Sequence, residues 1–134
     1  MKVDYSHYRI ENMLIKLSRY IHSQDFKGYD PYDALNSPIL KILTFNNTLA
    51  GIFWIQLLKF LPVNLRIFLG IKKEYNPKAM GLFLSAYSKK YAITRDKTDL
   101  EKIDFFSEWL VQNSAKGYSG LCWGYNFDWA NRTF

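Results

Sequence analysis

Apolar residues recur at three- and four-residue intervals along most of this chain, and this helical period is the feature that most constrains its fold. In the first 25 residues the period is carried by Ile10, Leu14, Leu17 and Ile21. The same pattern predicts helices at 5–23, 48–61, 77–93 and 98–114, a short helical turn at 39–43, and long loops at 24–37 and 115–134. No strand is predicted. We therefore expect an all-α fold of antiparallel helical hairpins joined by loops of uneven length.

Helix-capping side chains precede the predicted helices. Asn76 followed by Pro77 supplies a cap and a first helical residue. Thr98 and Glu101 have the spacing of a capping box, in which each side chain bonds the other's backbone amide. One of residues 46–48 is expected to cap the helix that follows.

The stretch 49–71 is close to the ~20 apolar residues that a membrane-spanning helix needs. Lys59 and Arg66 lie inside it, however, and each base costs about 2.5–3.5 kcal/mol at the middle of a bilayer. Pro62 also divides the stretch and predicts a separate short helix at 62–68. We expect this segment to lie on a surface or in a core, with its bases reaching solvent.

The net charge of +6 is concentrated in one part of the chain. Residues 34–73 carry five bases and no acid, whereas the two flanking parts are nearly balanced. Nucleic-acid binding is not expected, because it favours a dense basic stripe on a polar element. A basic and apolar segment fits a membrane surface or an anionic partner better.

Metal and cofactor sites are not expected from the residues present. Cys122 is the only cysteine, and His7 and His22 are the only histidines, so a disulfide or a cysteine-based cluster cannot form within the chain. No phosphate-binding glycine loop is visible. The N-terminus lacks the apolar core of a signal peptide, so a cytoplasmic location is the expectation.

Three segments together resemble a known family. They are "GYDPYDALNSP" at 28–38, "IKKEYNPKAMGLFLSAY" at 71–87 and "WGYNFDW" at 123–129. In this order and spacing they resemble the N-terminal part of six-hairpin glycosidase-like proteins encoded in bacterial and archaeal exopolysaccharide and capsule biosynthesis clusters. The resemblance implies an α/α toroid of twelve helices.

In such a toroid, loops at one end surround a funnel where sugars bind in the catalytic members. The resemblance therefore implies an oligosaccharide or polysaccharide as partner. Aromatic rings and carboxylates in the two distinctive loops are the expected substrate-binding residues: Asp30, Asp33, Trp123, Tyr125 and Asp128. No catalytic residue is assigned, because no carboxylate pair of fixed spacing is visible. Whether the chain is an enzyme stays open at this point.

Each of these residues also has an ordinary structural interpretation. Asp33 is placed to cap a short helix, and Asp30 before Pro31 is a common turn arrangement. Asp128 is suited to a local hydrogen bond in its loop, and Trp123 to anchoring that loop in a core. The sequence leaves both interpretations standing.

Residues 1–134 are expected to form a single partial domain, since about five helices cannot close a twelve-helix toroid. The expectation is therefore a fragment that self-associates when isolated, because its outer apolar faces lack neighbours. The alternative is a small basic helical module without catalytic activity. In that case residues 34–73 would bind a membrane surface or a protein.

Overall fold

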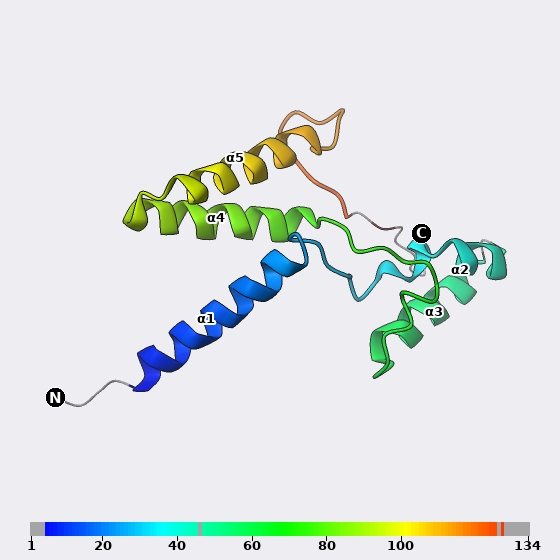
Figure 1. Ribbon diagram of the computed structural model, residues 1–134. Coiled ribbons are helices and arrows are strands. Elements are labelled where there is room, and N and C mark those ends of the chain that lie inside the picture. The colour runs from blue at the N-terminus through cyan, green and yellow to red at the C-terminus, as the bar shows by residue number, and fades with distance from the viewer. Residues whose placement is uncertain (1–4, 46, 126, 128–134) are drawn as a thin grey trace.

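The computed structural model describes residues 5–45, 47–125 and 127, and the described chain is all-α. Five α-helices and one short 3-10 helix follow one another, and no strand is present in the described ranges (Figure 1). They are α1 (Tyr5–Ser23), η1 (Asp33–Asn36), α2 (Pro38–Leu43), α3 (Thr48–Phe60), α4 (Pro77–Thr94) and α5 (Lys97–Gln112). The helical prediction is thus confirmed, with the ends of the four long helices within two residues of those expected.

Short polar side chains set the helix starts. Asn47 caps α3 by accepting from the amides of Leu49 and Ala50. The start of α5 differs from the prediction. Asp96 is its cap and accepts from the Thr98 amide, so the helix begins before the predicted capping box. Aspartate at the N-cap satisfies the same unpaired amides that the box would have served.

The predicted helix at 62–68 is wrong. Residues 61–70 form bends and turns, in which the Asn64 side chain accepts from the Arg66 amide. That local bond offers the backbone an alternative to helix, as asparagine side chains commonly do. Among the described residues, no helix is both long and apolar enough to cross a membrane.

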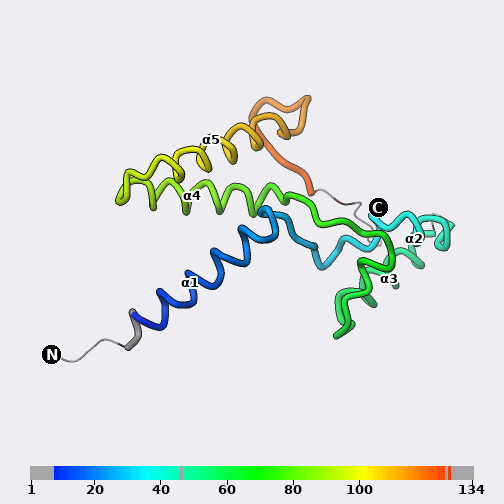
Figure 2. The backbone as a smooth tube through the Cα atoms, viewed as in Figure 1, coloured from blue at the N-terminus to red at the C-terminus, as the bar shows by residue number. Residues whose placement is uncertain are grey.

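Two small hydrophobic cores hold the chain together. Figure 2 shows the backbone segments around them, α2 with α3 in one group and α4 with α5 in the other. The first lies among η1, α2, α3 and the turn after α3, and its buried residues are Ala34, Leu40, Ile55, Leu58 and Ile71. The second lies between the end of α1 and the α4–α5 pair, and its buried residues are Phe26, Met80 and Phe106. The ring of Phe26 packs edge-on against Phe83 and Phe106, at centroid distances of 5.3 and 5.0 Å.

Helices α4 and α5 form an antiparallel hairpin, whereas α1 extends away from the rest (Figure 1). Every side chain from Tyr8 to Tyr20 on α1 is exposed. Of the predicted apolar stripe, only Ile21 packs against the second core. The periodicity therefore located this helix correctly, while most of its apolar face remains uncovered.

The two cores are joined where residues 28–33 run beside residues 66–76. Gly28 and Glu74 exchange two backbone hydrogen bonds of 3.1 Å each. Asp33 accepts from Arg66 Nε at 2.8 Å, and only 5% and 12% of these side chains are exposed. Burial raises the pKa of Asp33, and the Arg66 guanidinium partly offsets that rise.

We predict that Arg66→Met destabilises the protein more at neutral than at acidic pH. Without Arg66, the pKa of Asp33 rises further, so ionising this carboxylate opposes folding. Because the folded state then holds the proton more tightly than the unfolded state, stability falls as pH rises through that pKa. The expected loss in the free energy of unfolding is about 3 kcal/mol near pH 7, since a buried charge loses its partner.

Urea unfolding followed by circular dichroism, near pH 4 and near pH 7, measures this difference. Lys72→Met is the matched control, because Lys72 is an exposed base on the same segment. Adding Asp33→Asn to Arg66→Met should recover much of the neutral-pH loss. A loss that is the same at both pH values would refute the prediction.

Candidate functional site

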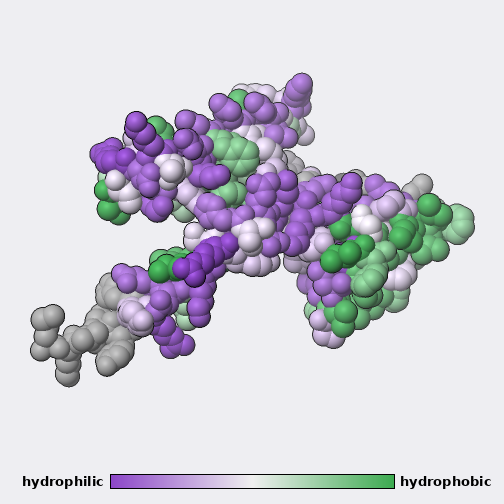
Figure 3. Space-filling view, in the orientation of Figure 1, coloured by the Kyte–Doolittle hydropathy of each residue, from purple (hydrophilic) through white to green (hydrophobic). Residues whose placement is uncertain are grey.

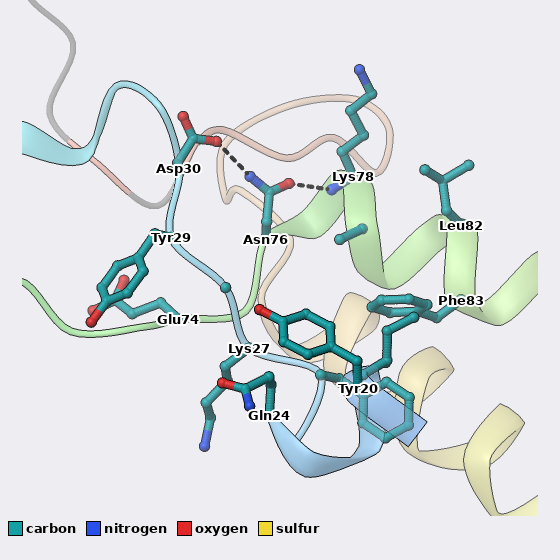
Figure 4. A pocket seen from close by; sticks show the side chains of 14 residues that line it. Tyr20, Gln24, Lys27, Tyr29, Asp30, Glu74, Asn76, Lys78, Leu82 and Phe83 are labelled. Atoms are coloured by element: carbon teal, nitrogen blue, oxygen red, sulfur yellow. Dashed lines mark hydrogen bonds between the residues drawn. The ribbon is translucent and has the colours of Figure 1, made fainter. Parts of the chain in front are cut away.

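A pocket of about 350 Å³ lies where the end of α1, the loop after it and the first turns of α4 meet. Its size is within the usual range for small-ligand sites. Its walls mix aromatic rings with polar groups, and the residues that line it include Tyr20, Gln24, Asp30, Asn76 and Phe83 (Figure 4). A ligand with both apolar and hydroxyl-bearing faces would find complementary groups here.

Asn76 connects the two polar walls of this pocket. Its Oδ1 accepts from the Lys78 amide at 3.0 Å, which caps α4. Its Nδ2 donates to Asp30 Oδ2 at 3.3 Å. Figure 4 shows Asn76 between Asp30 and the first turn of α4, joined to each by a hydrogen bond. One side chain therefore fixes both the helix start and the position of the Asp30 carboxylate.

A second pocket of about 320 Å³ adjoins the first at the start of α4. Asn76 and Lys78 line both pockets, and Trp123 and Tyr125 supply the other wall of the second one. The ring nitrogen of Trp123 donates to the Leu110 carbonyl at 2.7 Å, which ties its loop to the last turns of α5. The ring of Trp123 is thereby held in a fixed position.

Ring stacking joins the two aromatic loops. Phe127, which is only 8% exposed, lies parallel to Tyr125 at 5.0 Å and to Tyr32 at 6.5 Å. The Lys59 ammonium lies over the Tyr32 ring, 4.8 Å from its centre, and donates a hydrogen bond to the Tyr32 hydroxyl. Phe127 is thus packed against Tyr32 of the loop at 28–33.

The predicted site residues fall into three groups. Asp30 lines the first pocket, and Trp123 and Tyr125 line the second. Asp33 lines neither, because its buried carboxylate accepts from Arg66 and from the Asp30 amide. Asp128 lies outside the described residues. Cys122, the single cysteine, is half-buried.

Sequence reasoning did not assign Tyr20, Asn76 or Lys78 to a site. Asn76 was identified only as a helix cap, and Tyr20 was assigned to no site. They come together because the end of α1 lies near the first turns of α4. The nearest sequence signal is the resemblance segment 71–87, which contains Asn76 and Lys78.

We predict that Asn76→Ala and Asn76→Ser have different effects on stability. Alanine removes the cap and should lower the free energy of unfolding by about 1 kcal/mol. Serine keeps a capping oxygen, so the loss should be a few tenths of a kcal/mol, but its side chain is too short to reach Asp30. Both variants should therefore shift the amide NMR signals of residues 28–32.

Chemical denaturation and two-dimensional NMR together separate the two roles of Asn76. Lys78 amide exchange should stay slow in the serine variant and become faster in the alanine variant. Equal stability of the two variants, or unmoved signals in 28–32, would contradict the assignment.

The two pockets bring aromatic rings and hydrogen-bonding groups together. The Asp30 carboxylate accepts from the Tyr32 amide at 3.0 Å as well as from Asn76, so it is held in one orientation with lone pairs left for hydroxyl donors. In the part of the chain that the structure describes, no group of three or more His, Cys, Asp or Glu side chains is placed to hold a metal ion.

No protein-family model, no curated protein and no solved structure matches this chain.

Proposed function

We propose that this chain binds an oligosaccharide or polysaccharide across the two adjoining pockets at the start of α4. The observation that carries the proposal is the meeting of aromatic rings and hydrogen-bonding groups from three separate segments. Residues 20–30, 74–83 and 123–125 each contribute to the pocket walls. Pyranose rings present flat C–H faces and hydroxyl edges, which match rings such as Tyr125 and polar groups such as Asp30.

The arrangement supports binding more strongly than catalysis. Asp30 and Glu74 both line the first pocket, but the Asp30 carboxylate is already held by two hydrogen bonds. A general acid must be within reach of the glycosidic oxygen, and no described group is identified by its geometry for that role. We therefore assign these residues to positioning a sugar.

The architecture is compatible with the wider family interpretation. The antiparallel α4–α5 pair is the kind of hairpin from which an α/α toroid is built. Under this proposal the chain forms N-terminal hairpins of a six-hairpin glycosidase-like toroid that serves surface polysaccharide biosynthesis. The two pockets would then occupy one part of the sugar-binding funnel.

We predict that Tyr125→Ala weakens glycan binding by about five- to ten-fold, which corresponds to about 1–1.4 kcal/mol. Tyr125 is 63% exposed and lines the second pocket, so the change removes ring surface offered to a ligand. Asp30→Asn should also weaken binding, although its remaining oxygen can still accept from the Tyr32 amide.

Tyr118→Ala is the matched control, because Tyr118 is 71% exposed in the same C-terminal loop and lines neither described pocket. Binding is measured by tryptophan fluorescence and saturation-transfer NMR against cellohexaose, maltohexaose and hyaluronan hexasaccharide. If none of these binds at millimolar concentration, or if Tyr125→Ala and Tyr118→Ala behave alike, the proposal fails.

A further inference from the structure

The surface over α2, α3 and the turn after α3 exposes an unusual amount of apolar area. Six large hydrophobic side chains between residues 42 and 68 are each 70–88% exposed. They are Ile42, Phe45, Leu49, Phe60, Ile67 and Phe68, and we call them the α2–α3 apolar surface. Figure 3 shows hydrophobic surface gathered over these elements, whereas the visible face of the α4–α5 hairpin is mainly hydrophilic.

Phe45, in the turn between α2 and α3, is held outward at a backbone cost. Its φ of 47° lies in the left-handed region, which is strained for a bulky residue. Phe26 has a similar φ of 58°, but its ring is only 6% exposed and packs in the second core. The Phe45 ring is 88% exposed, so packing within the chain does little to offset the strain.

The charges within the segment that carries this surface are all of one sign. Residues 34–73 contain no acid. Lys41 and Lys59 each directly precede one of the six apolar residues, Lys72 lies four positions after Phe68, and all three lysines are exposed. Arg66 contributes less, since Asp33 already compensates its charge. An apolar face bordered by bases is the pattern of segments that lie in the interface of an anionic bilayer.

We propose that the α2–α3 apolar surface docks on an anionic membrane surface, with the Phe45 turn entering the interface and the net positive charge of residues 34–73 attracting phosphate headgroups. A second copy of this chain fits less well, because a symmetric contact would bring this acid-free surface against itself. No described helix is long and apolar enough to cross a bilayer, and the proposed contact is a peripheral one. This inference is independent of the sugar pockets, which are lined by other residues.

The experiment is flotation of the full chain with phosphatidylcholine vesicles, with and without phosphatidylglycerol. Affinity for the anionic vesicles should be at least about ten-fold higher and should fall as salt screens the lysines. Phe45→Asn should weaken binding by about ten-fold or more, because it removes the inserted ring. Asparagine tolerates the left-handed backbone, so this variant should keep its fold.

Ile93→Asn is the matched control, since Ile93 is 86% exposed near the end of α4, far from this surface in the sequence. Lys41→Gln with Lys72→Gln should weaken anionic binding on the order of 20-fold, and Lys89→Gln with Lys116→Gln should weaken it much less. Equal binding to neutral and anionic vesicles would overturn the proposal, as would equal effects of Phe45→Asn and Ile93→Asn. The proposal is also overturned if the wild type binds no vesicles and light scattering shows an oligomer that Phe45→Asn dissociates. That result would make the surface a contact between copies of this chain.

Discussion

The reciprocal backbone pairing of Gly28 with Glu74 is the contact on which the rest of the structure depends. Around it, Asp30 bonds to Asn76 on one side, and Asp33 bonds to Arg66 on the other. These contacts join residues 33 to 46 positions apart, so they close large loops and must offset the entropy of doing so. They also connect the two cores, because Asp33 begins η1 beside the first and Asn76 begins α4 beside the second.

Those parts of the fold that depend on neighbouring residues were predictable from the sequence. Asn76 and Pro77 start α4 as expected, because a capping oxygen and a fixed proline φ act within one turn of chain. The helix predicted at 62–68 does not form, and the reason is equally local: the Asn64 side chain accepts from the Arg66 amide. Sequence periodicity also predicted the bounds of α1. It could not show that the residues from Tyr8 to Tyr20 would stay exposed, because periodicity says nothing about which other element covers an apolar face.

The candidate site was less predictable, because its groups come together through distant contacts. Asp30 before Pro31 could be interpreted as a turn residue, and it does accept from the Tyr32 amide. Its bond to Asn76 could not be inferred from either neighbourhood alone. Asp33 shows the converse case. The local pattern predicts a helix cap, but Tyr32 occupies the cap position and Asp33 is the first residue of η1. Its pairing with Arg66, 33 residues away, removes its carboxylate from the surface.

The two uncovered apolar faces of the molecule differ in a way that exposure alone does not reveal. On α1, the exposed residues Leu14 and Leu17 are accompanied by charges of both signs, including Glu11 and Arg19. α1 carries three bases and one acid, so an anionic bilayer would attract it less per base than a segment that holds bases alone. Beside the α2–α3 apolar surface every charge in 34–73 is positive, and the attractions add. The absence of acids in 34–73, more than the apolar area, is therefore the feature on which the proposed membrane contact of this face, and not of α1, rests.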